Sequence, residues 1–198
     1  TNKFTVEGKK IGYIKISIFA ANTDTQFATK LKELEENGID SLIIDVRDNP
    51  GGFVSDTIKI ADLLCGEGLI IKEEYGDGTV KTFKSDKDSS KVPFVLLVNE
   101  NSASASEILA GSVKDLKAGK VIGTQTFGKG IMQSYIELEN GGGVAITIAK
   151  YYTASGNEIH GVGIEPDIKV ELPKGTTIDY KVNPNTDLQL KEAINALK

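Results

Sequence analysis

Three serines alternate with alanines in segment 99–107, which reads Asn-Glu-Asn-Ser-Ala-Ser-Ala-Ser-Glu. The segment follows the apolar run 94–98, so we expect a turn between a buried strand and a helix. A serine at a helix N-terminus lies beside backbone N–H groups that have no intrahelical partner, and near the positive end of the helix dipole. Such groups can stabilise the oxyanion of an acyl-transfer reaction. By itself, however, the segment favours a plain helix cap, with the rest no more than a flexible turn.

A serine nucleophile needs a base, and the sequence offers two kinds. His160 is the only histidine and lies in a turn-like segment, where we expect a structural or solvated role rather than a place in a Ser-His-Asp triad. Lys129 lies between Gly128 and Gly130, next to apolar residues. A lysine acts as a base only when neutral, so burial would have to lower its pKa from about 10.4. The alternative is an exposed lysine on a glycine turn.

Two further features of the sequence could assist a serine nucleophile and a lysine base. Gln133 is expected on the same face of a strand as Lys129, where its amide could hold the amine in place. Segment 45–52 reads Asp-Val-Arg-Asp-Asn-Pro-Gly-Gly and follows another apolar run. Its glycines, Gly51 and Gly52, can present backbone N–H groups to a ligand and complete an oxyanion hole. A simple Pro-Gly turn is the structural alternative.

The elements that must position these residues alternate between strands and helices. A strand is expected at 12–19, with Ile14, Ile16 and Ile18 on one face. Thr23 or Asp24 is expected to cap a helix that ends near Gly38. The apolar stripe of this helix comprises Phe27, Leu31 and Leu34.

Further strands are expected at 42–46, 69–75, 79–83, 94–98, 121–122, 131–138 and 144–152. The glycine-rich turns 76–78 and 140–143 predict two hairpins. Further helices are expected after Gly52, with Ile58, Ala61 and Cys65 on one face, and at 107–117 and 187–197. This interleaving indicates an α/β domain, with strand 42–46 buried and parallel to its neighbour.

Composition limits the function classes. The formal net charge of −5 argues against a nucleic-acid-binding surface. One cysteine and one histidine exclude a zinc site of the Cys/His type within this chain. The longest apolar run has five residues, too few to span a membrane. The 198 residues are expected to form one domain, and the chain starts at Thr1 without a signal-peptide pattern, which indicates a fragment or a processed form.

Taken together, the segments resemble the carboxyl-terminal processing peptidases, also called tail-specific proteases. The resemblance rests on 45–52, 98–107, and 126–130 with Gln133. Segments 12–14, 161–167 and 187–190 resemble the same family in the same order, so the resemblance covers nearly the whole chain. It implies a Clp protease/crotonase-like fold, built of repeated ββα units with a mixed β-sheet and flanking helices.

The resemblance also implies a role for individual residues. It assigns the nucleophile to Ser104 and the general base to Lys129, with Gln133 in the position of a lysine-orienting residue. The backbone N–H groups of Ala105 and of Gly51 or Gly52 match the family's oxyanion hole. Asp115 matches an acidic position with a structural or supporting role.

The expected activity is that of a serine endopeptidase that cleaves proteins at or near their C-termini through an acyl-enzyme. The resemblance implies no metal or organic cofactor, a protein or peptide substrate bound by its C-terminal segment, and an extracytoplasmic or cell-envelope location. We expect residues 1–11 to be a lead-in, 12–173 the core and 174–198 a tail with a short helix. Many family members carry a PDZ domain ahead of the core, and the eleven residues before Gly12 cannot form one, so we expect a catalytic core without it.

Two alternatives have the same expected fold. One is a retinoid- or lipid-binding module that resembles these peptidases without cleaving anything. The other is a crotonase-type acyl-CoA enzyme, which also stabilises an oxyanion with backbone N–H groups. Neither requires the combination of Ser104, Lys129 and Gln133.

Overall fold

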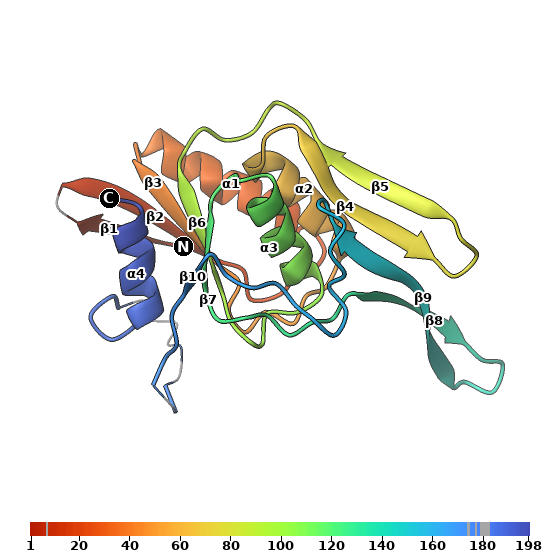
Figure 1. The fold of residues 1–198 in the computed structure, drawn as a ribbon. Coiled ribbons are helices and arrows are strands. Elements are labelled where there is room, and N and C mark those ends of the chain that lie inside the picture. The colour runs from red at the N-terminus through yellow and green to blue at the C-terminus, as the bar shows by residue number, and fades with distance from the viewer. Residues whose placement is uncertain (7, 174, 177, 179–182) are drawn as a thin grey trace.

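The chain forms two β-sheets with three helices packed between them (Figure 1). The structure is a computed structural model and describes residues 1–6, 8–173, 175–176, 178 and 183–198. The helices are α1 (Thr23–Glu36), α2 (Val54–Leu64), α3 (Ala105–Asp115) and α4 (Leu188–Ala196). The strands are β1 (Asn2–Val6), β2 (Lys9–Lys15), β3 (Ser41–Asp45), β4 (Gly68–Tyr75), β5 (Val80–Ser85), β6 (Phe94–Val98), β7 (Lys120–Gly123), β8 (Ile131–Glu137), β9 (Gly143–Thr153) and β10 (Ile168–Lys169).

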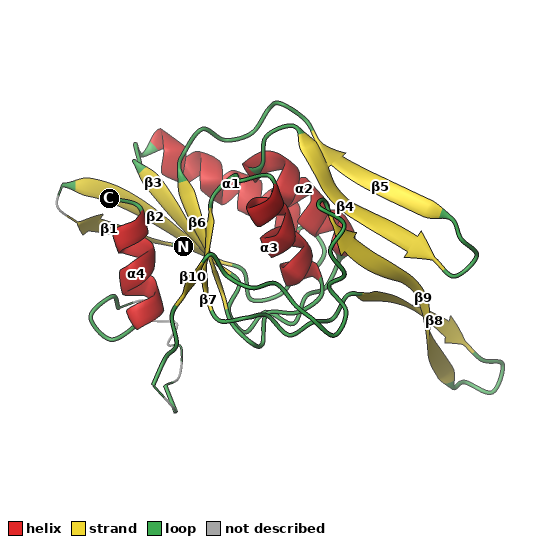
Figure 2. Ribbon diagram, in the orientation of Figure 1, coloured by secondary structure: helices red, strands yellow, loops and turns green. Residues whose placement is uncertain are grey.

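The larger sheet has six strands in the order β1-β2-β3-β6-β7-β10. Strand β1 is antiparallel to β2, and the remaining neighbours are parallel. Both faces of the central strands are covered, because α1, α2 and α3 pack on one side and α4 packs on the other (Figure 2). Central strands buried on both faces explain why β3 and β6 consist of continuous apolar runs rather than alternating ones.

Alternate residues of these strands belong to two separate cores. Ile14, Ile44 and Leu96 join the larger core, beneath α1, α2 and α3. Tyr13, Ile43 and Leu97 join a smaller core with residues of α4. Because side chains alternate along a strand, the C-terminal helix packs against the same sheet whose strand β6 leads into residues 99–107, the serine turn.

The second sheet is antiparallel, with the order β5-β4-β9-β8. Its far end, the β8–β9 hairpin, extends away from the body of the molecule (Figure 1). This hairpin exposes several large apolar side chains, namely Tyr135, Ile136, Leu138, Val144 and Ile146.

Most of the expected elements are confirmed, including both hairpins and the buried stripe Phe27, Leu31 and Leu34 of α1. The expected cap of α1 is wrong. The helix begins at Thr23 itself, and the preceding Asn22 enters it in a left-handed conformation with φ of 69° and no side-chain cap. Sequence propensity favoured a side-chain cap, but the chain reaches the helix through a tight turn instead.

The expected single strand 12–19 also needs correction. Strand β2 starts at Lys9 and ends at Lys15, and the first 11 residues include β1 and the start of β2 rather than a lead-in alone. Ile14 and Ile16 are buried, but Ile18 is 53% exposed. The chain leaves the sheet after Ile16, and Phe19 then forms an isolated bridge with Gly52.

The expected tail 174–198 is described only in part, since residues 174, 177 and 179–182 lie outside the described residues. Its expected helix is confirmed as α4, with the Asp187 side chain accepting a hydrogen bond from the Leu190 N–H as its N-cap. Among the described helices, none has the length and apolar character needed to cross a bilayer.

The smaller core predicts a large stability effect at Leu190. This side chain is fully buried in that core, so Leu190→Ala should lower the free energy of unfolding by about 2–5 kcal/mol. Leu188→Ala serves as the control. Leu188 is the first residue of the same helix and is 45% exposed, so its replacement should lower the free energy of unfolding much less. Chemical denaturation of both variants measures the difference, and equal effects would mean that α4 is not packed as described.

Candidate active site

Ser104 lies at the junction between β6 and α3, immediately before the helix begins at Ala105. Its backbone has φ of 54° and ψ of −112°, an unusual conformation for a residue other than glycine. Such a conformation costs free energy and persists only where the surrounding structure imposes it. The side chain is half-buried. The turn therefore presents a serine at a helix N-terminus, as the sequence predicts.

The other two serines of the turn have structural hydrogen bonds. Ser102 and Ser106 are both 0% exposed. The Ser102 hydroxyl donates to the Val46 carbonyl at 2.8 Å, and the Ser106 hydroxyl donates to the Asn49 carbonyl at 3.0 Å. Both hydroxyls fasten the serine turn to segment 45–52. Of the three serines, only Ser104 is placed to meet a substrate.

Glu107 connects the serine turn, residues 99–107, to the lysine turn, residues 126–130. Its carboxylate is fully buried and accepts four hydrogen bonds. Oε2 accepts the backbone N–H of Ser104 at 2.8 Å and that of Lys129 at 2.7 Å. Oε1 accepts the Thr126 hydroxyl and the Gly128 N–H, both at 2.6 Å. One oxygen atom thus holds the backbones of the two residues to which the family resemblance assigns the roles of nucleophile and base.

The lysine turn is a loop between β7 and β8, and the chain segment that follows β9 also supports it. The Thr126 hydroxyl accepts the Ile164 N–H at 2.7 Å, and the Gly161 N–H donates to the Gly128 carbonyl at 2.9 Å. Lys129 is half-buried, but Phe127 is 66% exposed and contributes little to the apolar surroundings expected there. Within the described residues, the structure gives no hydrogen bond between the Lys129 amine and the Ser104 hydroxyl.

The two glycines of segment 45–52 approach the serine turn closely. A Cβ on Gly51 would lie 2.8 Å from the Cβ of Ser104, and one on Gly52 would lie 2.1 Å from the Phe19 carbonyl oxygen. Their φ angles are 105° and 133°. Only glycine fits at either position, for steric and conformational reasons together.

The N–H groups near Ser104 differ in what they bind. The Gly51 N–H donates to the Asn49 side-chain oxygen at 2.8 Å and is therefore occupied. The N–H groups of Gly52 and Ala105 donate no hydrogen bond to any residue in the described part of the chain. A Cβ on Gly51 would lie 3.0 Å from the Ala105 nitrogen, which places this loop directly beside the start of α3.

Gln133 does not have the expected relation to Lys129. Lys129 precedes β8, which starts at Ile131, and a register shift lies between Met132 and Gln133. The extra residue of this shift is Ile148 on β9, and Lys129 lies outside β8, so the strand alternation on which the expectation relied does not extend to Lys129. Gln133 is exposed and has no side-chain hydrogen bond to the described residues.

Asp115 and His160 lie outside the immediate serine turn. Asp115 ends α3 and accepts hydrogen bonds from the Ser155 N–H at 2.7 Å and the Ser155 hydroxyl at 2.8 Å. At about 1.5 Å of rise per residue, it lies roughly 16 Å along the helix from Ser104. His160 is exposed, but its backbone packs against Gly130, where a Cβ would lie 2.3 Å from the His160 nitrogen.

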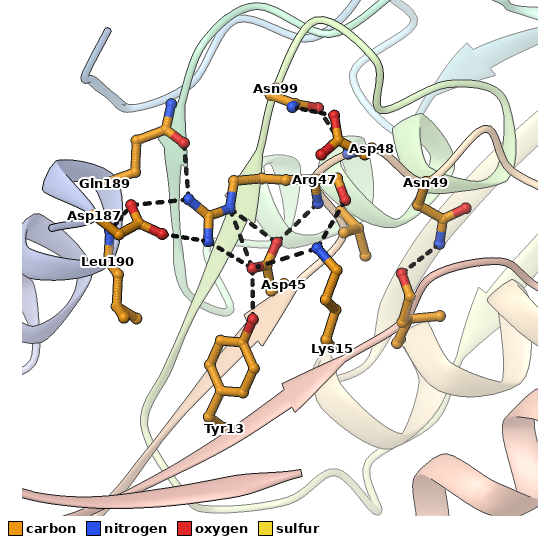
Figure 3. A network of polar contacts seen from close by, with 12 residues as sticks. Tyr13, Lys15, Asp45, Arg47, Asp48, Asn49, Asn99, Asp187, Gln189 and Leu190 are labelled. Carbon is orange, nitrogen blue, oxygen red and sulfur yellow. Dashed lines mark hydrogen bonds and ion pairs between the residues drawn. The ribbon is translucent and has the colours of Figure 1, made fainter. Parts of the chain in front are cut away.

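A second polar network lies beside segment 45–52 and was missed by sequence reasoning. The buried Arg47 guanidinium binds Asp45 from β3, together with Asp187 and Gln189 from the C-terminal helix region (Figure 3). Tyr13 donates its hydroxyl proton to Asp45 at 2.7 Å, and burial together with the Asp45 charge raises the pKa of this phenol. Glu107 was also missed, although the spacing Ser104-x-x-Glu107 is that of a capping box and could have indicated it.

No group of three or more histidine, cysteine, aspartate or glutamate side chains in the described residues is arranged to hold a metal ion.

The four-donor arrangement predicts a large cost for replacing Glu107. Glu107→Gln keeps the shape but directs an NH₂ group at backbone or hydroxyl donors, so the free energy of unfolding should fall by about 2–4 kcal/mol. Glu100→Gln is the control, because it also replaces a carboxylate on the same turn, but an exposed one. It should change the free energy of unfolding by less than about 0.5 kcal/mol. Urea denaturation of both variants distinguishes the two effects. A Glu107→Gln variant as stable as the control would contradict the buried network.

Several known proteins are similar to this chain in sequence and in structure. The chain is similar to the carboxyl-terminal-processing protease of Synechocystis sp., with 41% identity over 192 residues, covering 96% of this chain and 44% of the relative. It is similar to a probable CtpA-like serine protease of Staphylococcus haemolyticus, with 36% identity, covering 92% of this chain and 40% of the relative. The solved structure of a photosystem II D1 C-terminal processing protease matches with a TM-score of 0.76 and 35% identity, covering 84% of this chain and 45% of that one.

The chain thus spans less than half the length of these relatives. The family model for peptidase family S41 matches residues 10–170. This range contains the serine turn, the lysine turn and segment 45–52. The chain belongs to peptidase family S41.

Proposed function

We propose that residues 1–198 form one peptidase catalytic domain, a serine endopeptidase that cleaves proteins at or near their C-termini through an acyl-enzyme. Ser104 is the nucleophile and Lys129 the general base. The observation that carries this assignment is the Glu107 carboxylate, whose Oε2 accepts the N–H groups of both residues. The backbone nitrogens of two residues 25 positions apart are thereby bound to the same carboxylate oxygen.

In the proposed reaction, the neutral Lys129 amine takes the proton of the Ser104 hydroxyl as the oxygen attacks the scissile carbonyl carbon. The resulting ammonium group then gives its proton to the leaving amine, and the acyl-enzyme forms. Water attacks this ester with Lys129 again acting as the base, which releases the new C-terminus and regenerates the serine. No cofactor is needed for these steps.

The proposed oxyanion hole consists of the backbone N–H groups of Gly52 and Ala105. Both are near Ser104, and neither is spent on another hydrogen bond to the described residues. Gly51 contributes by its lack of a side chain, because a Cβ there would collide with the Cβ of Ser104. The positive end of the α3 dipole adds to this stabilisation.

Gln133 and Asp115 are assigned lesser roles. Gln133 is the proposed lysine-orienting residue, which requires a rearrangement at the start of β8, because its amide is exposed here. Asp115 supports the site from a distance by tying the end of α3 to the Ser155 turn.

The proposed fold type is that of Clp protease and crotonase, for which the succession β1, β2, α1 supplies one ββα unit. The proposed partner is a polypeptide bound by its C-terminal segment, and the proposed location is the cell envelope or another extracytoplasmic compartment, on family resemblance alone. Membership of family S41 favours a peptidase over a lipid-binding module or an acyl-CoA enzyme.

Substitution of the proposed dyad tests the assignment. Ser104→Ala and Lys129→Ala should each lower kcat for cleavage of a C-terminally labelled polypeptide by about a thousandfold or more, because each removes a group that reacts. Ser102→Ala and Ser106→Ala are the matched controls. They should lower thermal stability, since they remove buried hydrogen bonds to Val46 and Asn49, but keep most of the activity of the folded fraction. Near-normal proteolysis by Ser104→Ala or Lys129→Ala would refute the dyad.

A further inference from the structure

Arg47 is almost completely buried at the point where β3 leads into segment 45–52, and it binds one carboxylate two residues away, Asp45, and one 140 residues away, Asp187 (Figure 3). Its Nε donates to both Asp45 oxygens, at 3.0 and 3.1 Å, and its Nη2 donates to Asp45 Oδ2 at 2.7 Å. On the other side, Nη1 donates to Asp187 Oδ1 at 3.0 Å, and Nη2 lies 2.8 Å from Asp187 Oδ2. Two-pronged contacts of this kind fix the plane of the guanidinium.

Asp187 adds a second carboxylate to the charges around Arg47. Lys15 lies 3.9 Å from Asp45 Oδ2, so Asp45 faces two cations, and Asp187 supplies the second anion. Burial acts to lower the pKa of Arg47, but hydrogen bonds and charges from Asp45 and Asp187 outweigh it and raise the pKa. Without the Asp187 charge, Arg47 would keep Asp45, which it shares with Lys15, but would lose its second carboxylate partner, and weakening a buried ion-pair cluster in this way is unfavourable.

The backbone of Arg47 continues directly into the loop that faces Ser104. Its N–H donates to Asp45 Oδ1 at 2.9 Å, and its carbonyl accepts the Lys15 amine at 3.2 Å. The next residue, Asp48, has φ of 60° and donates its N–H to the Asn99 side chain at 2.9 Å. Burial alone would raise the pKa of Asp48, but hydrogen bonds from Asn101 and Asn99 lower it.

The loop then meets the serine turn. The Asn49 carbonyl accepts the Ala103 N–H at 3.0 Å and the Ser106 hydroxyl, and its side-chain oxygen accepts the Gly51 N–H. Only residues 48–50 separate Arg47 from Gly51, and Asp48 and Asn49 are both held by hydrogen bonds.

Asp187 also begins α4, where its Oδ1 accepts the Leu190 N–H at 3.0 Å. The neighbouring Gln189 accepts Arg47 Nη1 at 3.0 Å and donates to the Val170 carbonyl at 2.8 Å. The helix lies on the face of the larger sheet opposite α1, α2 and α3 (Figure 2). Its N-terminus is joined to the start of segment 45–52 through Arg47.

We propose that Asp187 is a positioning residue for catalysis: by clamping Arg47 from the C-terminal helix, it holds the backbone of residues 48–52 in the geometry that stabilises the oxyanion at Ser104. This inference rests on the proposed function, because it assigns the loop to the oxyanion hole. It makes the C-terminal segment a part of the catalytic machinery, although that segment contributes no reacting atom.

Asp187→Asn tests the proposal, since asparagine caps a helix as well as aspartate does but lacks the negative charge that faces Arg47. It should lower kcat by about tenfold or more with a smaller change in KM, because the loss falls on the transition state. Asp187→Glu, which restores the charge, should recover part of kcat. Glu192→Gln removes one carboxylate from the same helix away from Arg47 and should behave as wild type.

Amide hydrogen exchange supplies a readout that needs no activity. Exchange of the backbone N–H groups of residues 48–52 should be faster in Asp187→Asn than in Glu192→Gln, while circular dichroism shows α4 intact. Unchanged exchange at 48–52, or an unchanged kcat in Asp187→Asn, would overturn the proposal. Activity that survives in Ser104→Ala would instead refute the proposed function and leave the exchange result to decide the link between Asp187 and the loop.

Discussion

The site depends on the hydrogen bonds that the buried carboxylate of Glu107 accepts. This carboxylate accepts four hydrogen bonds from two turns that are separated in sequence, at the N-terminus of α3 and in the loop before β8. A buried carboxylate without such donors would be too costly to keep charged, and four buried donors without it would be unsatisfied. Each turn therefore depends on the other, and the close approach of Ser104 and Lys129 follows from this mutual dependence.

Strain and close packing around Ser104 have the same origin. The backbone of Ser104 keeps its unusual conformation because Glu107 binds its N–H from one side, while Gly51 fills the space on the other. Segment 45–52 is held there by Ser102 and Ser106, whose hydroxyls bind its carbonyls. The three segments with unusual sequence thus form one contiguous unit, and the buried Arg47 cluster connects that unit to the C-terminal helix.

Sequence patterns predicted the parts of this structure that depend on local periodicity. The buried strands at 42–46 and 94–98, the stripe of α1 and both hairpins were predicted because burial and turn geometry act over a few residues. The partner of Arg47 is 140 positions away in Asp187, and nothing in the local pattern marks such a pair. The ends of strands likewise depend on how distant strands meet: β2 ends before Ile18 and β8 begins after Lys129, so the expected alternation does not reach either residue.

The most direct measurement of the central claim is identification of the residue that reacts with a serine-directed fluorophosphonate, by peptide mass spectrometry of the labelled protein. The account predicts a single adduct on the Ser104 hydroxyl and a strong loss of labelling in Lys129→Ala, because the base is required to activate that hydroxyl. An adduct on Ser102, Ser106 or any other residue would contradict it. Labelling of Ser104 at an unchanged rate in Lys129→Ala would contradict it equally.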